Sequence, residues 1–537
     1  MMRANLRRSA AVAAFAFAGL LSACGPRGNT RPPCPPGEQC LNTGITTEPF
    51  TLDPNKFQMS SEYDILRDLM VGLTAVDAYG KVIPGMATSW TISPDGLTWT
   101  FKLREATWSD GVPVTAADFV EGFRRIQDPA TASPYSYLLY PIKGAQEVNA
   151  GKAPRDTVAA FAPDPRTVVL KLVNPTPHLP SILTYGGAMP IPVHAIKRWG
   201  DNWVKPGRYV SNGAYTLAAR MTGDRVVLRK NPRYWNADKV CFDQVSYFVA
   251  TDLVAAERRV AAGELDTMTS FDPKRAPFLR KSLPGYIDPQ PMLWITYISF
   301  NSQIPALQDR RVRLAANMAI DREFITTKLS DIGQQPLYGF TADGLDGYAN
   351  PPPPAWADWP FERRIAAAAA LMRQAGYTSA RPLKLELSYY ASLNRSIAAA
   401  VKADWRRIGL DVDLSSAETQ IHFQNLVAKD FEIAFDGWTA DFADPITFLE
   451  LLRSSAGPQN HSGYVNQRYD ALIARAEHEP DAKRRLMLLS RAERIIMKDL
   501  PVAPIYANAS GQIVDPALTG FHSNPLDVHP KEFVCRR

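Results

Sequence analysis

The pattern of apolar and polar positions predicts alternating strands and helices in the second half of the chain. Apolar residues alternate with polar ones over residues 383–390 and 410–414, and residues 431–435 form a short apolar strand. Between them, residues 395–408 and 421–428 have the spacing of amphipathic helices. A β-α-β-α-β order of this kind predicts parallel strands joined by right-handed crossovers. We therefore expect an open α/β sheet in this region.

Shorter patterns predict further elements before and after this region. We expect strands over residues 97–103, 168–173 and 225–229 and helices over residues 61–69, 115–126 and 253–262. Two apolar stretches, residues 294–301 and 502–507, are candidates for strands that cross between domains. A length of 537 residues, with 44 prolines and 32 glycines, predicts two or three domains with many turns and long connections.

The first 24 residues have the pattern of an export signal. Three arginines precede an apolar run over residues 10–21, which is too short to remain as a membrane-spanning helix. The run ends in Leu21-Ser22-Ala23-Cys24, which resembles a bacterial lipobox. That resemblance implies a signal peptide over residues 1–23, cleavage before Cys24 and acylation of Cys24, so that lipid tethers the mature chain. The alternative is an ordinary signal peptide with a chance cysteine.

Residues 24–40 are rich in proline, glycine and arginine, and we expect them to be a tether between the membrane and the folded body. Either the inner or the outer membrane could hold the anchor. The formal net charge is +6, and without residues 1–23, which hold three arginines and no acidic residue, it is about +3. A charge this small and dispersed argues against a nucleic-acid partner. Contents of 46% hydrophobic and 21% charged residues fit a soluble globular protein.

Four cysteines follow Cys24, at positions 34, 40, 241 and 535. An even number in an exported protein favours disulfides, and four cysteines allow three pairings. Cys34 and Cys40 bracket a Pro-Pro-Gly turn, which favours their pairing and leaves Cys241 for Cys535 as a hypothesis. No histidine has ligand spacing from these cysteines, so we expect no metal site.

The segment from Gly437 to Leu452 follows the apolar strand that ends at residue 435. In this segment Asp444 precedes Pro445, which fits an N-cap carboxylate followed by proline at the first helical position. We therefore expect a helix over residues 446–452 and a strand-to-helix loop before it.

Helix capping leaves Asp441 unexplained, between Trp438 and Phe442 in the expected loop. A carboxylate among aromatic rings loses hydration and needs a cation or several N–H donors. In open α/β sheets ligands bind at the carboxyl ends of strands, and this loop lies just beyond such an end. We therefore predict that Asp441 faces a ligand; the alternative is a solvated loop aspartate.

The common enzyme motifs are missing. The chain has no Gly-x-Ser-x-Gly, no His-Glu-x-x-His, no P-loop and no Gly-x-Gly-x-x-Gly after a strand. Its seven histidines are scattered, and we interpret them as surface or structural residues. Asp441 and Asp444 could mimic a glycosidase pair, but the cap explains Asp444 better. The pattern favours a binding protein without a cofactor over an enzyme.

Several segments together resemble one family, the extracellular solute-binding proteins of ABC importers, in the oligopeptide-binding group. They occur in the family's order and extend over nearly all of the mature chain. The matching segments are residues 51–54, 99–104, 108–111, 113–116, 118–120, 128–135, 211–215, 231–232, 234–236 and 437–449. Each of them alone is weakly specific, and the set is highly specific.

The resemblance implies an α/β fold of the periplasmic-binding-protein type, a two-lobed type II clamp in its large three-domain form. An extended peptide would lie between the lobes, and the two crossing strands would be the hinge. The implied domains are domain I (residues 41–70, 189–294 and 509–537), domain II (residues 71–188) and domain III, the second lobe (residues 295–508).

The resemblance also implies a ligand site. Asp441 would pair with the α-ammonium of the peptide, and Trp438 and Tyr135 would line the pocket. The backbone groups of Gly437, Thr439 and Ala440, on either side of Trp438, would bind the peptide main chain as in strand addition. Without the resemblance, Trp438 could equally be a core residue of the lobe and Tyr135 a loop anchor.

The chain departs from the family at the other end of the ligand. Two basic residues and a histidine of the family fall at Leu426, Phe435 and Asn394, and none of these is cationic. A pocket tryptophan of the family falls near Thr419, and an acidic residue near Gln58. We expect Asn394, Thr419, Phe435 and Gln58 to line the pocket. A peptide carboxylate would then be held differently, or the ligand is longer or is not a free peptide.

The resemblance implies a monomeric, lipid-anchored receptor on the periplasmic side of the cell envelope. It would capture oligopeptides and deliver them to the permease and ATPase of an ABC importer. Two alternatives remain. One keeps the fold and changes the cargo to a murein peptide, a nickel chelate or a small glycan. The other is a secreted hydrolase.

Overall fold

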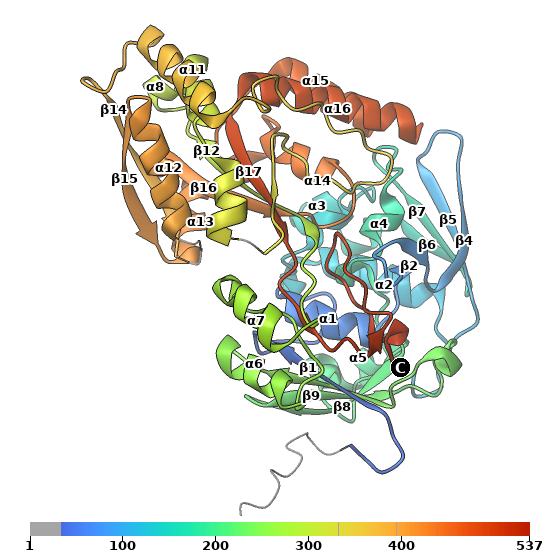
Figure 1. The fold of residues 1–537 in the computed structure, drawn as a ribbon. Helices are drawn as coiled ribbons and strands as arrows, with labels where there is room; N and C mark the ends of the chain where they lie inside the picture. Colours follow the sequence, from blue (N-terminus) through green and yellow to red (C-terminus); the bar gives the residue numbers. More distant parts are fainter. Residues whose placement is uncertain (1–33, 331, 392, 394) are drawn as a thin grey trace, which may run out of the picture.

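The structure is a computed structural model that describes residues 34–330, 332–391, 393 and 395–537 (Figure 1). The expected signal peptide, Cys24 and most of the tether therefore lie outside the described residues, as does Asn394. Within the described part, no helix is both long enough and apolar enough to cross a membrane.

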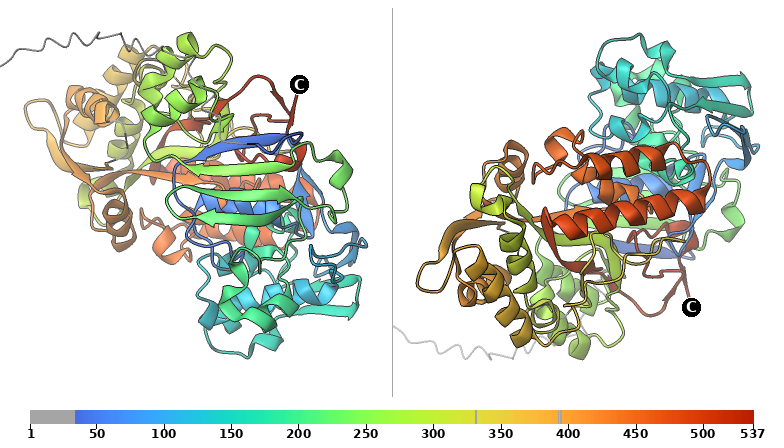
Figure 2. Two further views of the ribbon diagram at one scale, coloured as in Figure 1. Left: turned by 90° about the horizontal axis from the view of Figure 1, so that it is seen from below. Right: turned by 90° about the horizontal axis from the view of Figure 1, so that it is seen from above.

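The first of three main sheets combines distant parts of the chain. It has six strands in the order β18-β11-β1-β10-β9-β8, and β1 runs parallel to both β10 and β11. Its strands are β1 (Cys40–Ile45), β8 (Tyr215–Met221), β9 (Arg225–Lys230), β10 (Gln244–Val249), β11 (Thr267–Met268) and β18 (Ile513–Val514). The longer strands lie side by side in the view from below (Figure 2, left).

The second sheet is a four-stranded antiparallel sheet in the order β4-β5-β7-β6. Its strands are β4 (Ala87–Ile92), β5 (Thr98–Leu103), β7 (Thr167–Lys171) and β6 (Ala160–Asp164). Trp99, Phe101 and Leu103 alternate toward the core along β5, as their spacing predicted. Helix α2 (Ala116–Gln127) packs on this sheet and begins with a capping box between Thr115 and Asp118.

The third sheet contains the predicted β-α-β-α-β unit. Its order is β13-β17-β12-β16-β14-β15, and β14 runs parallel to both β15 and β16, which confirms the prediction. The strands are β12 (Pro291–Phe300), β13 (Gln335–Pro336), β14 (Leu383–Tyr390), β15 (Leu410–Ala417), β16 (Ile433–Thr439) and β17 (Val502–Ala509). Helices α12 (Arg395–Arg407) and α13 (Thr419–Ala428) are the crossovers.

Strands β12 and β17, the two predicted crossing strands, pair antiparallel at the centre of the molecule (Figure 1). One prediction about their neighbour was wrong. We expected β16 to end at residue 435 and a loop to follow, but β16 continues to Thr439, because residues 436–439 pair with β12.

The remaining helices cover the sheets and connect them. The helix predicted over residues 446–452 is present as α14 (Ile446–Leu449) followed by a 3-10 turn over Glu450–Leu452. The others of seven residues or more are α1 (Ser60–Leu69), α5 (Val193–Trp199), α6 (Leu253–Ala261), α7 (Ala276–Ser282), α9 (Arg310–Met318), α11 (Phe361–Gln374), α15 (Gln467–Glu477) and α16 (Ala482–Asp499). Helices α15 and α16 lie side by side in the middle of the view from above (Figure 2, right), and they form the upper edge of the molecule in Figure 1.

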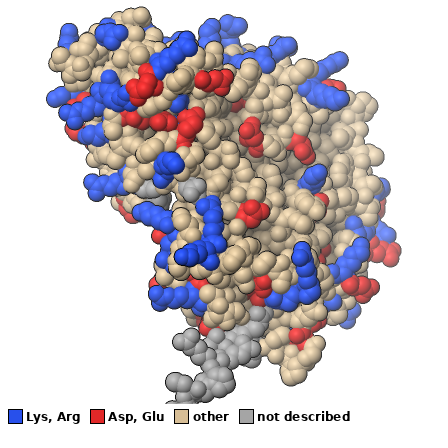
Figure 3. Space-filling model, in the orientation of Figure 1, with Lys and Arg blue, Asp and Glu red and all other residues tan. Residues whose placement is uncertain are grey.

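The buried apolar residues show where the parts of the molecule meet. One large cluster extends through the first two sheets and continues into α14, α15 and α16. A second cluster fills the third sheet and the helices that cover it. On the face shown in Figure 3, basic and acidic side chains are interspersed, as expected from the small net charge.

The first described residues and the C-terminal segment are fastened to the first lobe by disulfides. The structure joins Cys34 to Cys40 and Cys241 to Cys535, with Cα–Cα distances of 5.9 and 5.3 Å, which are the pairings that the sequence favoured. Near the second disulfide, the buried Asp68 carboxylate of α1 accepts a hydrogen bond from the Lys531 backbone N–H at 2.9 Å. The C-terminal segment therefore returns to the body of the first lobe.

A buried ion pair fixes α14 against α16. The two terminal nitrogens of the Arg485 guanidinium, Nη1 and Nη2, donate to the Asp444 carboxylate at 2.7 and 2.8 Å, and Asp444 also accepts from the Ile446 N–H at 3.0 Å. Asp444 therefore accepts from the first backbone N–H of α14, but the residue directly before the helix is Pro445, so the cap that we predicted at Asp444 lies one residue further along the chain. Burial tends to raise the pKa of Asp444, but the charges of Arg485 and His178 outweigh it and hold that pKa below its usual value.

Replacing Arg485 by methionine should destabilise the protein by about 3–5 kcal/mol, because the Asp444 charge then stays buried without its partner. The measurement is the free energy of unfolding in urea. A double variant, Arg485→Met with Asp444→Leu, is the control, since it removes both charges and should recover much of the loss. Equal stability of wild type and the single variant would contradict this view of the pair.

Candidate functional site

Asp441 lies just after β16 and faces a tyrosine from the second-sheet region. The Tyr137 hydroxyl donates to Asp441 Oδ2 at 3.1 Å, across 304 positions of sequence. The Asp441 carboxylate forms no ion pair with any described residue and is partly buried. Burial raises its pKa to about 6, and the Tyr137 hydrogen bond opposes that rise only in part. The site thus holds a carboxylate without a cation of its own.

The position of Asp441 is set by Thr447, which is fully buried in α14. The Trp438 indole N–H and the Asp441 backbone N–H both point to the Thr447 hydroxyl oxygen, each at 3.3 Å. Because the Asp444–Arg485 pair holds α14, the loop that carries Asp441 is anchored at two points.

Asp436, five residues before Asp441, is a carboxylate of the same region that does have a charged neighbour, His461. It is fully buried and accepts hydrogen bonds from Ser299 Oγ and His461 Nδ1, both at 2.8 Å. Burial acts to raise the pKa of Asp436, but the His461 charge and these hydrogen bonds hold it below its usual value. No sequence pattern linked Asp436 to His461. The same lobe therefore supplies a charged neighbour for Asp436, whereas no described residue supplies a cation for Asp441.

Tyr135 belongs to an aromatic cluster beside Asp441. Its ring stacks on Phe57 with centroids 5.2 Å apart and meets the edge of Tyr185 at 5.1 Å. Its hydroxyl donates to the Gln58 carbonyl at 3.3 Å. Burial raises the pKa of Tyr135, and the Asp441 charge raises it further, so the hydroxyl stays protonated and can donate. Tyr135 was predicted from the sequence as a site residue and Tyr137 was not, although both lie in the same tyrosine-rich segment.

The far edge of β16 is open next to Asp441. Strand β14 pairs with β16 only at Ile433 and Ala434. Backbone groups of successive residues point to opposite edges of a strand. The Ala440 N–H donates to the Leu293 carbonyl of β12 at 2.7 Å, so Gly437 and Thr439 present their backbone groups to the edge away from β12. Among the described residues, no strand pairs with that edge beyond Ala434.

Two of these backbone groups are already engaged within the protein. The Gly437 N–H donates to Asp436 Oδ1 at 2.8 Å, and the Ala440 N–H is held by Leu293. The Gly437 carbonyl and the exposed Thr439 are the parts of this edge that face outward.

A cavity of about 620 Å³ adjoins Asp441 and separates the two lobes. One wall includes Tyr137, Tyr140, Thr176 and His178, and the other includes Trp438, Phe442, Ile446, Glu450 and Arg453. The His178 ring stacks on Phe442 at 5.4 Å, which closes one side of the cavity. A volume of this size and an aromatic lining are typical of ligand sites.

The other predicted pocket residues lie in different places. Phe435 and Leu426 are fully buried in hydrophobic clusters, so their side chains present no surface to a ligand. Gln58 is exposed beside Tyr135, and Thr419 is partly buried at the start of α13. The Phe435 carbonyl accepts a hydrogen bond from His422 Nε2 at 2.7 Å.

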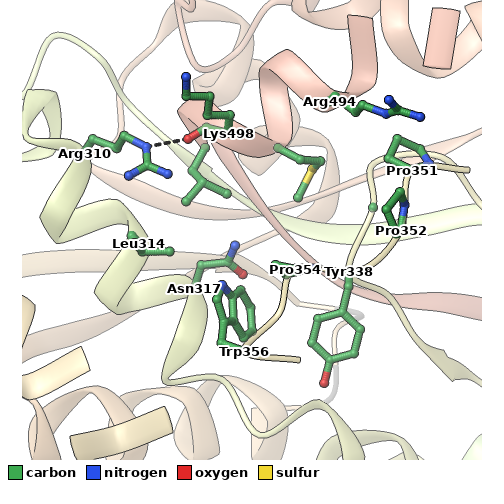
Figure 4. Close-up of a pocket in the computed structure, with 13 residues that line it drawn as sticks. Arg310, Leu314, Asn317, Tyr338, Pro351, Pro352, Pro354, Trp356, Arg494 and Lys498 are labelled. Carbon is green, nitrogen blue, oxygen red and sulfur yellow. Dashed lines mark hydrogen bonds between the residues drawn. The ribbon is translucent and has the colours of Figure 1, made fainter. Parts of the chain in front are cut away.

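A second cavity, of about 540 Å³, lies between α9, the end of α16 and the proline-rich segment 351–354 (Figure 4). Tyr338 and Trp356 form its aromatic wall, and Arg310 donates to the Lys498 carbonyl at its rim. None of the predicted site residues lines this cavity. In the described ranges, no group of three or more His, Cys, Asp or Glu side chains is arranged to hold a metal ion.

Known proteins resemble this chain over most of its length. The family described as "Bacterial extracellular solute-binding proteins, family 5 Middle" matches residues 81–460. Over 497 residues the chain is 36% identical to the periplasmic oligopeptide-binding protein OppA of Escherichia coli (strain K12), with 91% of each chain covered. It is equally identical, over 497 residues, to the periplasmic murein peptide-binding protein MppA of the same strain, with 91% of this chain and 92% of that one covered.

Solved structures agree with the sequence comparison. The unliganded open form of MppA superposes with a TM-score of 0.83 at 34% identity, with 93% of this chain and 98% of that chain covered. This likeness confirms the α/β two-lobed type II fold that the resemblance implied.

Replacing Asp441 by asparagine should stabilise the free protein at neutral pH. A pKa raised from 3.8 to about 6 by folding means that the folded state disfavours the ionised form. The cost is absent below about pH 4, grows as the pH rises through 6, and is then on the order of 1 kcal/mol for this partly exposed group. The measurement is the difference in Tm between wild type and Asp441→Asn at several pH values. A difference that does not grow between pH 4 and 7 would contradict it.

Proposed function

Because the chain belongs to the bacterial extracellular solute-binding proteins, family 5, we propose that it captures oligopeptides outside the cytoplasm and delivers them to the permease and ATPase of an ABC importer. The observation that carries this proposal is the Asp441 carboxylate, which lies between the lobes with a tyrosine donor and no cation. A peptide α-ammonium supplies the missing charge.

The proposed chemistry recognises features that all peptides share. The ammonium pairs with Asp441, and the peptide main chain adds as a strand along the open edge at Gly437 and Thr439. Trp438, Tyr135 and Tyr137 provide aromatic surface for the residues that follow. Affinity then depends little on the side chains of the ligand, apart from those that meet charged groups of the cavity.

The proposal includes a lipid anchor at Cys24 and a location on the periplasmic side of the envelope. The lipobox-like residues 21–24 support the anchor, and the periplasmic relatives support the location. The anchor would keep the receptor at the surface of the inner or the outer membrane.

One alternative cargo has specific support. The identity to MppA is as high as that to OppA, so a murein peptide is the second candidate cargo. Mass spectrometry of the ligand that copurifies with the protein separates the two cargoes. The family is one of substrate-binding proteins; a hydrolase would instead convert an added peptide to fragments, whereas a receptor returns it intact.

Replacing Asp441 by asparagine should weaken peptide binding by about 2–5 kcal/mol, because the buried ammonium loses its counter-charge. Titration calorimetry with a tripeptide on the purified chain measures this. Asp430→Asn, which removes an exposed carboxylate of the same lobe, is the matched control and should bind like wild type.

The same ion pair predicts a pH dependence. The Asp441 carboxylate has a pKa of about 6 in the free protein, and a bound ammonium must lower it, so binding requires the ionised form. Wild-type affinity should therefore be constant above pH 7 and fall roughly tenfold per pH unit below 6. Asp441→Asn should lack this fall. Affinity that the asparagine variant retains in full would remove Asp441 from the site.

A further inference from the structure

The cavity beside Asp441 is surrounded by more negative than positive charge. Four carboxylates lie in or next to its walls, at Asp441, Asp444, Glu450 and Glu477, and two guanidiniums, at Arg453 and Arg485. Arg485 neutralises Asp444, and Arg453 neutralises Glu477 with a nitrogen–oxygen distance of 2.5 Å. Two carboxylates remain without a cation, those of Asp441 and Glu450.

Glu450 faces the cavity directly. Its side chain is exposed to that space and has no hydrogen-bond or ion-pair partner among the described residues. It begins the 3-10 turn that extends α14, three residues after Thr447, and residues three apart lie on one helix face. Thr447 holds the Asp441 loop, so Asp441 and Glu450 are brought to the same end of the cavity. The charges of Asp441 and Glu450 both raise the pKa of Tyr137, so Tyr137 lies near both carboxylates.

The two free charges repel each other. Although Glu450 is exposed to the cavity, the protein atoms around it remove part of its hydration and raise its pKa to about 7, and the Asp441 charge is the next largest cause of the rise. The Arg453 charge lowers the pKa of Glu450, but it is the smallest of the causes, and Arg453 forms its ion pair with Glu477. The single α-ammonium of a peptide satisfies Asp441 and leaves Glu450 unpaired. A ligand with two positive charges at its amino end would satisfy both carboxylates.

We propose that Glu450 forms a cationic subsite, which takes the side chain of a lysine or arginine at the first position of a peptide held by Asp441. This inference rests on the proposed function. The α-ammonium and the first side chain are attached to the same Cα, so the ammonium can reach Asp441 while the side chain reaches Glu450 at the same end of the cavity. The rings of Tyr137 and Tyr140 line the space between, where they can cover the methylene stem of such a side chain.

The test compares two tripeptides of equal length and similar volume, Lys-Ala-Ala and norleucine-Ala-Ala, by titration calorimetry at pH 7.5. Wild type should bind the lysine peptide about tenfold more tightly. Glu450→Gln should reduce that ratio to near one. Glu386→Gln, an exposed glutamate of β14 that does not line the cavity, is the matched control and should keep the wild-type ratio.

The outcomes separate the subsite from the proposed function. If wild type binds both peptides equally, or if Glu450→Gln keeps the lysine preference, the subsite is overturned and peptide capture stands. If wild type binds neither peptide, peptide capture is overturned and the subsite falls with it. Thermal unfolding of each variant confirms that the chain is folded, and Asp441→Asn, which should lose both peptides, shows that binding occurs at this end of the cavity.

Discussion

A carboxylate without a counter-charge, at Asp441, is the constraint on which the site depends. Three aspartates lie within nine residues, and the fold treats each differently. Asp436 is neutralised by His461 and Asp444 by Arg485, whereas among the residues that the structure describes only the Tyr137 hydroxyl contacts the Asp441 carboxylate. The free protein therefore carries an electrostatic cost at Asp441 that an incoming cation can relieve. Binding and stability are opposed at this position, as is common where a site is kept ready for a ligand.

The rest of the structure holds that charge in place. Strand β16 is paired along one edge by β12 and is open along the other beyond Ala434, so the residues before Asp441 are rigid and still able to add a strand. The buried Thr447 ties the loop to α14, and the Asp444–Arg485 pair ties α14 to α16. Strands β12 and β17, which we expect to connect the lobes, pair with each other in the same sheet, and β12 also pairs with β16. The expected connections therefore adjoin the strand that leads to Asp441.

The charges of the cavity suggest how general and selective recognition can coexist. An ammonium and a main chain occur in every peptide, so Asp441 and the open edge of β16 do not depend on ligand sequence. Recognition by the proposed Glu450 subsite does depend on ligand sequence, since its carboxylate attracts a positive side chain and repels a negative one. Leu426 and Phe435, at which the resemblance led us to expect basic residues, are both buried apolar residues. In the proposed site the amino end of the ligand would therefore meet acidic groups, and neither of those two positions would supply a cation.

Local patterns in the sequence were sufficient for much of the fold. Alternation and helical spacing predicted the β-α-β-α-β unit and both crossing strands, since these signals come from residues close together in the chain. Capping chemistry predicted the start of α14, and the resemblance predicted the fold class. The end of β16 was missed, because its last residues are strand only through pairing with β12, about 140 positions earlier. The Asp436–His461 pair, the Tyr137–Asp441 contact and the unpaired Glu450 left no local signal. Which carboxylates receive a partner is decided when distant segments pack together, so only the tertiary structure could show which charges the protein leaves free for a ligand.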